Sequence, residues 1–198
     1  MNRHFLQLAV AVVALSLTAG SSQAKEAMIT ALKGKVTIAP ANGSGAEVAA
    51  SPKSKVGDGD HVRTGSGSYV EIKFSDGSVG RLGPNSAFHS KSSNFTVDRG
   101  EGLFAFVKGK SGFTVSTPSL NASILGTTVD VKVSRNLVEY SCLEGHCRIG
   151  AHVLNPGEKL TIRGSKVAYS APKTKVDVDR FIKESPLINS LGKMANVP

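Results

Sequence analysis

Apolar and polar residues alternate along the chain between residues 29 and 169, and Gly, Asn, Asp or Pro interrupts the alternation about every 8 to 12 residues. A period of two is typical of β-strands that bury one face, because successive side chains point to opposite sides of a sheet. The pattern is clearest in Lys35–Ala39, Tyr69–Phe74, Leu103–Lys108, Phe113–Thr117, Thr128–Val133, Leu137–Cys142, Cys147–Val153 and Lys159–Arg163. We therefore predict an all-β domain of about 8 to 12 short strands, arranged as a β-sandwich, a jelly-roll-like fold or a short β-roll.

Two connections in this pattern can be predicted in more detail. The small and polar stretch Ala39–Lys55 indicates a long surface loop or a weak edge strand. In "IKFSDGSVGRL", a two-residue turn at Asp76 and Gly77 would place a charged residue on the apolar face. A three-residue loop instead pairs Val70 with Leu82, so we predict that loop, with Gly77 at a positive φ.

The N-terminus has the features of a secretory signal peptide. Arg3 precedes the uncharged stretch Phe5–Gly20, and the small residues Ser22 and Ala24 occupy the positions that a signal peptidase recognises. An uncleaved membrane anchor would need a longer apolar run of about 20 residues. We therefore expect cleavage after Ala24 and a periplasmic or secreted protein that does not span the membrane once it has been cleaved.

The remaining chain divides into two parts. Residues 25–170 carry the alternating pattern and form the predicted β domain, of a length that suits one hydrophobic core. For residues 171–198 we predict a linker, a short amphipathic helix and a flexible tail. The helix is indicated by Val178, Phe181 and Ile182, which recur at helical spacing before Pro186.

The charge of the chain bears on its partners. It has 24 Lys and Arg residues against 15 Asp and Glu residues, a formal net charge of +9. The lysines are spread along the chain without a long basic block or interleaved aromatic residues, which indicates solvated strand faces and not a nucleic-acid groove. A basic exported protein associates with anionic polymers. We therefore expect an envelope protein or an anionic polymer as partner, and no nucleic acid.

The two cysteines, Cys142 and Cys147, lie close together in the sequence. If they face each other across a four-residue loop, Tyr140 meets Ile149 and the apolar side chains share one face. We expect a disulfide, since thiols of exported proteins oxidise where geometry allows. A reduced, buried pair of thiols is the alternative, because the distance between directly opposed strand residues is close to the shortest that a disulfide allows. A structural zinc site needs four ligands, and only His146 lies near the two thiols.

Candidate catalytic and metal-binding residues are few. Asp58, Asp60 and His61 are residue types that can bind a metal ion. A calcium loop of the EF-hand type, however, needs a Glu at its twelfth position, and counting from Asp58 this chain has Tyr69 there. Asp also favours turns by accepting hydrogen bonds from nearby backbone N–H groups. The histidines lie in no recognised nucleophile or metalloprotease motif. We therefore predict a protein that is not an enzyme, with no catalytic residues, no bound metal and no cofactor.

Several segments in succession resemble the FecR domain. They are "VGDGDHVRTGSGSYVEIKFSDGSVGRLGPNS", "VDRGEGLFAFVK", "FTVSTPSLNASILGTTVDVKV", "VEYSCLEGHCRIG" and "LNPGEKL". The order that carries the resemblance is Gly59-Asp60, Thr64-Gly65, Asp76-Gly77-Ser78, Thr117-Pro118, Gly126-Thr127 and Gly157-Glu158, within roughly residues 31 to 163. The resemblance implies an all-β extracytoplasmic module.

FecR domains often occur in proteins that pass a surface signal to a sigma factor across the inner membrane. Those proteins also carry a cytoplasmic anti-sigma segment, a transmembrane helix and a further C-terminal domain, none of which this sequence predicts. What the resemblance implies here is therefore the module alone.

We expect an exported, non-enzymatic FecR-like module that binds a protein or an envelope polymer and serves as an accessory, sensing or regulatory component of the envelope. The binding residues that we predict are Asp58, Asp60, His61, Arg63, Thr64, Gly126 and Thr127. The residues predicted to set turn geometry are Gly57, Gly59, Gly65, Asp76, Gly77, Gly126 and Gly157. The alternative is a jelly roll that binds a small ligand or a carbohydrate, with or without hydrolytic activity. A purely structural secreted protein is a third reading.

Overall fold

The computed structural model describes residues 26–41, 45–107, 113–124 and 126–169, and all regular secondary structure in these residues is β. The strands are β1 (Ala27–Lys33), β2 (Val36–Ala39), β3 (Val48–Ala49), β4 (Lys55–Val56), β5 (His61–Thr64), β6 (Tyr69–Phe74), β7 (Val79–Leu82), β8 (Ala87–Lys91), β9 (Asn94–Ala105), β10 (Phe113–Ser116), β11 (Asn121–Ile124), β12 (Thr128–Ser134), β13 (Leu137–Glu144), β14 (Cys147–Ile149), β15 (His152–Leu154), β16 (Lys159–Arg163) and β17 (Lys166–Tyr169). The all-β prediction is confirmed, with 17 strands in place of the smaller number expected.

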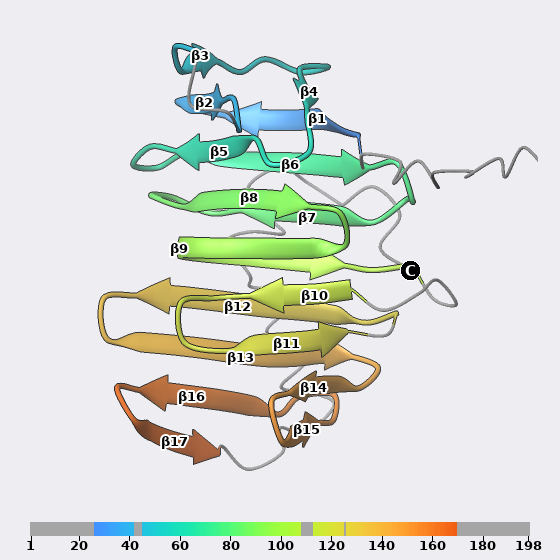
Figure 1. Cartoon of the computed structure of the whole chain (residues 1–198), viewed down its shortest axis with the longest axis vertical. Coiled ribbons are helices and arrows are strands. Elements are labelled where there is room, and N and C mark those ends of the chain that lie inside the picture. The colour runs from blue at the N-terminus through green and yellow to red at the C-terminus, as the bar shows by residue number, and fades with distance from the viewer. Residues whose placement is uncertain (1–25, 42–44, 108–112, 125, 170–198) are drawn as a thin grey trace, which may run out of the picture.

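The strands form two layers and run side by side as a stack (Figure 1). Layer A has the order β4–β1–β6–β7–β9–β12–β13–β16–β17. Layer B has the order β3–β2–β5–β8–β9–β10–β11–β14–β15. Strand β9 belongs to both, since residues 94–99 pair in layer B and residues 100–105 pair in layer A. The strands therefore make one continuous sheet that folds over itself and is not closed.

The second half of the chain places one hairpin in each layer in turn. Strands β10 and β11 pair in layer B, β12 and β13 in layer A, β14 and β15 in layer B, and β16 and β17 in layer A. A single hairpin has an apolar face that it cannot bury alone. Each hairpin that joins the opposite layer helps to cover the apolar face left by its predecessor, which explains the alternation.

The strands that the pattern missed are mostly short. The stretch Ala39–Lys55 contains β3 and the first residue of β4, in agreement with a weak edge strand. The segment Cys147–Val153, predicted as one strand, contains a turn at Gly150 that separates β14 from β15. The predicted signal peptide and C-terminal helix lie outside the described residues. Within the described residues, no helix is long and apolar enough to cross a membrane.

The β6–β7 hairpin has the predicted register. Val70 lies opposite Leu82 and Ile72 lies opposite Gly80, as a three-residue loop requires. Gly77 has a φ of +92°, a conformation that costs a residue with a Cβ about 1–2 kcal/mol. The backbone conformation of the turn thus explains why glycine occupies position 77.

Phenylalanine side chains dominate the core between the layers. They are Phe74, Phe88, Phe95, Phe104, Phe106 and Phe113, and all of them are buried. Neighbouring rings have centroids 4.6 to 6.3 Å apart, many in edge-to-face geometry. Because β6 and β9 contribute rings from layer A and β8, β9 and β10 contribute rings from layer B, this cluster joins the two layers.

The outer face of layer A also buries side chains. Val79, Leu103 and Leu143 form a second, smaller apolar cluster. Beside them, Arg81 lies opposite Glu71, and the Arg81 Nη2 and Nε atoms donate to Glu71 Oε2 at 2.7 and 2.9 Å. Both side chains are almost inaccessible, at 1% and 6% exposure. The sequence indicated that the Arg81 side chain points away from the core between the layers. It did not indicate that this side chain is buried on the outer face of layer A.

Asp130 lies in the same row of the outer face of layer A, opposite Leu103 on one side and Ser141 on the other. Burial raises the pKa of Asp130 to about 7, with a further contribution from the negative charge of Glu101. This carboxyl group is therefore costly to ionise in the folded protein.

Candidate functional site

The outer face of layer B carries short polar side chains in two adjacent rows. Thr96, Ser116 and Asn121 lie opposite one another across β9, β10 and β11, and Asn94, Thr114 and Ser123 form the next row. We call these six residues the hydroxyl face. Ser116 Oγ donates to Asn94 Oδ1 at 2.7 Å, which links the two rows. Short hydroxyl and amide side chains can both donate and accept hydrogen bonds, so this surface can bind a polar partner.

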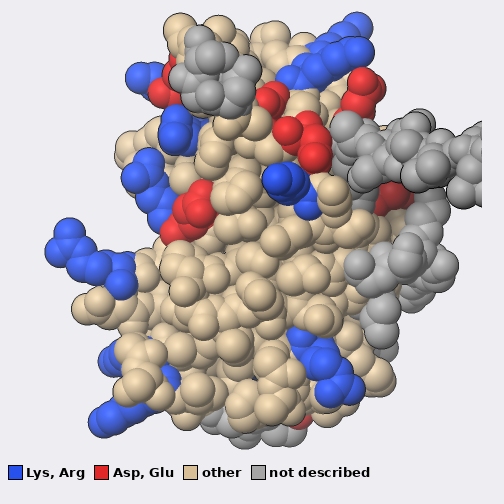
Figure 2. All heavy atoms as spheres, in the orientation of Figure 1, with Lys and Arg blue, Asp and Glu red and all other residues tan. Residues whose placement is uncertain are grey.

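Few charges interrupt the middle of the molecule on the side shown in Figure 2. The Lys, Arg, Asp and Glu side chains gather towards one end of the stack and along its margins, and a broad central area carries none of them. Charged side chains are typical of solvated protein surface, whereas the cores of protein interfaces are depleted in them. The uncharged area is therefore a candidate for contact with a partner.

The row that contains Thr96 continues into a cluster of two histidines and a carboxylate. His61 on β5 lies directly opposite His89 on β8, and their ring centroids are 4.7 Å apart. His89 Nδ1 lies 3.2 Å from Asp98 Oδ2. One ligand atom from each of the three residues lies within 4.8 Å of the others, the one such group found among the described residues. Imidazole and carboxylate are metal ligands, so these residues are the ones that could hold a metal ion.

The predicted residues before β5, Asp58 and Asp60, accept hydrogen bonds from the backbone. Asp58 Oδ1 accepts a hydrogen bond from Ser92 N at 2.6 Å. The two carboxylate oxygens of Asp60 accept hydrogen bonds from Ala41 N and Gly57 N at 3.1 and 2.8 Å. Backbone N–H groups thus engage both carboxylates. The bond from Gly57 N to Asp60 lies within the turn, whereas Ser92 N and Ala41 N come from other loops.

The predicted residues on β5 divide between the surface and the interior. Arg63 forms an exposed ion pair with Glu47 at 3.2 Å. Hydrogen bonds from Thr37 and then from Arg63 lower the pKa of Glu47. Thr64 is buried, and its Oγ1 donates to Gly83 O at 2.6 Å. His61 and Arg63 are therefore available at the surface, whereas Thr64 holds a neighbouring loop in place.

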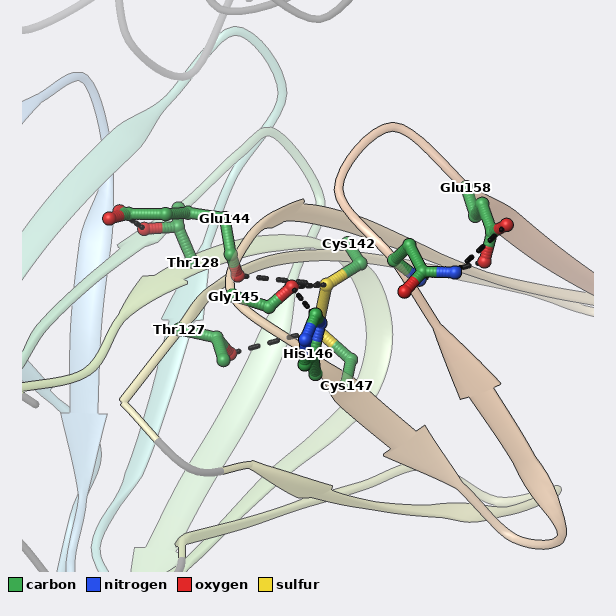
Figure 3. Close-up of a disulfide and its surroundings, with 9 residues drawn as sticks. Thr127, Thr128, Cys142, Glu144, Gly145, His146, Cys147 and Glu158 are labelled. Atoms are coloured by element: carbon green, nitrogen blue, oxygen red, sulfur yellow. Dashed lines mark hydrogen bonds between the residues drawn. A yellow bond between two sulfur atoms is a disulfide. The ribbon is translucent and has the colours of Figure 1, made fainter. Parts of the chain in front are cut away.

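Gly126 and Thr127 lie elsewhere in the fold, and Thr127 is beside the disulfide (Figure 3). Thr127 is 1% exposed, and its Oγ1 lies 3.6 Å from Cys147 Sγ. Between β5 and β14 in layer B stand four other strands, so the structure does not bring this pair together with Asp58 to Thr64. Gly126 has a φ of +61°, consistent with a conformational role.

The predicted turn glycines act in two ways. Gly59, Gly77 and Gly157 have positive φ angles. Gly57 and Gly65 do not, but a Cβ at Gly57 would lie 3.1 Å from the Asp60 carboxylate, which is a tight contact.

The cysteines form the predicted disulfide, with Cα atoms 5.9 Å apart. The predicted hairpin register around them is wrong. Cys142 lies on β13, which pairs with β12 and β16 in layer A, and Cys147 lies on β14, which pairs with β11 and β15 in layer B. Tyr140 consequently lies opposite Val131 and Leu160, not opposite Ile149. The disulfide therefore connects the two layers where the chain crosses between them.

A cavity of about 290 Å³ lies beside the middle of β9, where the loops after β10 and β12 meet the turn after β16. Asp98, Arg99, Ser119 and Arg135 are among the residues that line it, and Asp98 is the one carboxylate among them. Hydrolysis of glycosidic bonds commonly uses two carboxylates that face one cleft. The described lining of this cavity does not supply such a pair.

His89, Asp98 and the hydroxyl face were missed from the sequence. Strand segments such as "NFTVD", "FTVS" and "NASI" place Asn, Ser, Thr and Asp at alternate positions, which was the available signal. Their alignment across β8, β9, β10 and β11 depends on pairings between distant segments, including the parallel pairing of β9 with β10. The polar positions were therefore visible, but their assembly into one face was not.

Comparison with known proteins gives a match to the family model described as FecR protein, over residues 60–148. No curated protein matches the chain. Two crystal structures of a candidate anti-sigma factor from Parabacteroides distasonis, at 1.65 and 2.50 Å resolution, match with a TM-score of 0.51 and 18% sequence identity. At this identity, the likeness shows a shared fold.

Both structural matches cover 63% of this chain, and the chain covers 65% and 64% of the other two, slightly less than two thirds of their length. The family match begins at the turn before β5 and ends in β14, within the segment that the sequence motifs delimited. Residues 60–148 therefore match the FecR family model, and this part of the chain is a FecR domain.

Proposed function

We propose that the chain is an exported, non-enzymatic regulatory module of the cell envelope that binds a partner protein through the hydroxyl face of layer B. The FecR match over residues 60–148 carries this proposal. The solved protein of similar fold is a candidate anti-sigma factor, which favours a regulatory protein as the partner.

The hydroxyl face is suited to a protein partner for two reasons. Its Ser, Thr and Asn side chains lose little rotamer freedom on binding compared with Lys or Arg. They are also held on paired strands, and a rigid surface avoids part of the ordering cost of association. Asn94, Asn121 and Ser123 are exposed, Thr96 and Thr114 are half-buried, and Ser116 is buried, so a partner can reach the first five of these side chains.

Two further observations support export and binding without catalysis. The signal peptide predicted from the sequence would direct the chain out of the cytoplasm, and the disulfide between Cys142 and Cys147 favours an oxidising compartment. The cavity beside Asp98 holds a single carboxylate among its described lining residues, which supports a binding role over hydrolysis.

An envelope polymer is the second candidate partner. The hydroxyl face could form hydrogen bonds with sugar hydroxyl groups, and the basic chain would attract an anionic polymer. The chain has no Trp, the side chain that commonly stacks on sugar rings, so we rank a protein partner first.

Affinity capture from envelope extract tests the proposal. The bait is the cleaved chain, compared with a double variant of the hydroxyl face, Thr114→Arg with Ser123→Arg. Ser165→Arg, in the exposed turn between β16 and β17, is the matched control. We expect one protein that the native chain and the control retain and that the double variant retains about tenfold less, a loss of about 1.4 kcal/mol. Equal retention by all three baits contradicts the proposal, and capture of a polymer alone favours the second candidate.

A further inference from the structure

We propose that His61, His89 and Asp98 bind one divalent transition-metal ion, of which Zn²⁺ is the representative case. This inference rests on the geometry of these three residues and does not depend on the identity of the partner protein.

The strand pairing brings the three side chains together. His61 and His89 are direct cross-strand partners on β5 and β8, and Asp98 lies on β9, the strand that pairs with β8 on its other side. Cross-strand partners point to the same face of a sheet, with Cβ atoms about 4.5–5.5 Å apart. Both imidazoles therefore lie on the outer face of layer B, and the carboxylate lies next to them.

The distances fit a metal site after small side-chain rotations. The ligand atoms lie within 4.8 Å of one another. Ligands at about 2.0–2.1 Å from a tetrahedral zinc ion lie about 3.4 Å apart. The His89 and Asp98 side chains are 27% and 43% exposed, so they can rotate by this amount and a metal ion can reach them from solvent. Three protein ligands would leave the fourth position to water.

The chemistry of the ligands selects the class of metal. Imidazole nitrogen suits Zn²⁺, Ni²⁺ and Cu²⁺, whereas Ca²⁺ and Mg²⁺ prefer six or more oxygen ligands. Asp58 and Asp60 precede His61 in the sequence, but backbone N–H groups engage their carboxylates. Cys142 and Cys147 are joined in a disulfide and offer no thiolate. His61, His89 and Asp98 are thus the ligand set that the described residues support.

A metal ion at this position would join three strands. It would connect β5, which carries β2 and β3, to β8 and to the shared strand β9. Since the ligands come from separate strands, the folded chain would bind the metal more tightly than the unfolded chain. Metal binding would consequently stabilise the fold by mass action.

Isothermal titration with Zn²⁺ tests the proposal on the cleaved chain, prepared without a histidine tag. We expect one Zn²⁺ ion per chain. The double variant His61→Ala with His89→Ala should lose this binding, and Asp98→Asn should weaken it by about tenfold or more. The matched control is His146→Ala, because His146 is exposed and lies beside the disulfide, away from the proposed site.

Nuclear magnetic resonance of the same samples gives a second readout. Cu²⁺ is paramagnetic and should broaden the imidazole signals of His61 and His89 before those of His146 and His152. Circular dichroism spectra that match the native chain show that the variants are folded. Equal Zn²⁺ binding by the native chain and the double variant, absence of binding by the native chain, or loss of binding in His146→Ala would overturn the proposal.

Discussion

At the scale of the residue, the main finding is that charged side chains are buried on the outer face of layer A. Glu71 and Arg81 pair at 2.7 Å with almost no exposure, and Asp130 lies further along the same row of this face. Buried charges are costly unless they are paired. This face therefore contains the residues whose substitution should affect stability most strongly.

Arg81→Met should destabilise the fold by about 3 to 5 kcal/mol, because it leaves the Glu71 carboxylate buried without this guanidinium. The double variant Arg81→Met with Glu71→Gln should recover part of the loss. Urea denaturation measures the free energy of unfolding. The control is Arg63→Met, which removes an exposed ion pair with Glu47 and should cost no more than about 1 kcal/mol. Equal losses in the two single variants would contradict this account of Arg81.

Asp130 should make stability depend on pH. Its pKa is about 7 in the folded chain, against an ordinary value of 3.8, so the folded chain binds more protons than the unfolded chain between these values. The contribution of Asp130 to the free energy of unfolding is fully present below pH 3.8 and is lost as the pH rises to 7. The free energy of unfolding falls by at most about 1.4 kcal/mol per pH unit in this range. Asp130→Asn should remove this contribution. Urea denaturation of both proteins across this range measures the difference, and parallel stability curves would refute the prediction.

Individual turn residues could be predicted from the sequence, whereas individual contacts between distant strands could not. Gly77 was predicted because its turn is local and the apolar face of its hairpin fixes the register. Arg81 gave no comparable signal, because the alternation marked it only as a residue that avoids the main core. The cluster of His61, His89 and Asp98 depends on pairings among three strands, so local sequence did not reveal it.

At the scale of the element, β9 and the disulfide connect the layers in different ways. Strand β9 provides a continuous backbone that pairs in both layers, and the disulfide joins β13 to β14 at the crossing between them. The alternation of apolar and polar residues predicted the longer strands. It could not assign a strand to a layer, because the strands of both layers bury alternate side chains. The Cys142 and Cys147 hairpin was predicted wrongly for this reason.

Removal of the disulfide should have a modest effect on stability. The bond spans a sequence separation of 5 residues, and the chain-entropy model gives about 2 kcal/mol for a loop this short. Cys142→Ser with Cys147→Ser should therefore lower the free energy of unfolding by about that amount and leave the fold intact. Urea denaturation with and without a reductant checks it, since the reductant should affect the native chain alone. Two thiols that are alkylated in the native, non-reduced protein would contradict the bridge.

At the scale of the whole molecule, the alternating pattern was enough to predict the all-β class, and the succession of short motifs was enough to predict the FecR resemblance. Both are confirmed. The arrangement in two layers that share β9 needed the structure, because it depends on non-local pairings. That arrangement aligns the Ser, Thr and Asn positions of β9, β10 and β11 into the hydroxyl face, on which the proposed function rests.

The most direct test of this function is to map the partner's contact surface by nuclear magnetic resonance. Backbone amide signals of the isotope-labelled chain are recorded before and after addition of the partner that affinity capture identifies. We expect the signals that change to belong to β8, β9, β10, β11 and β14, around Asn94, Thr114 and Ser123 of the hydroxyl face. Changes confined to layer A, or no change at a saturating concentration of partner, would contradict the account.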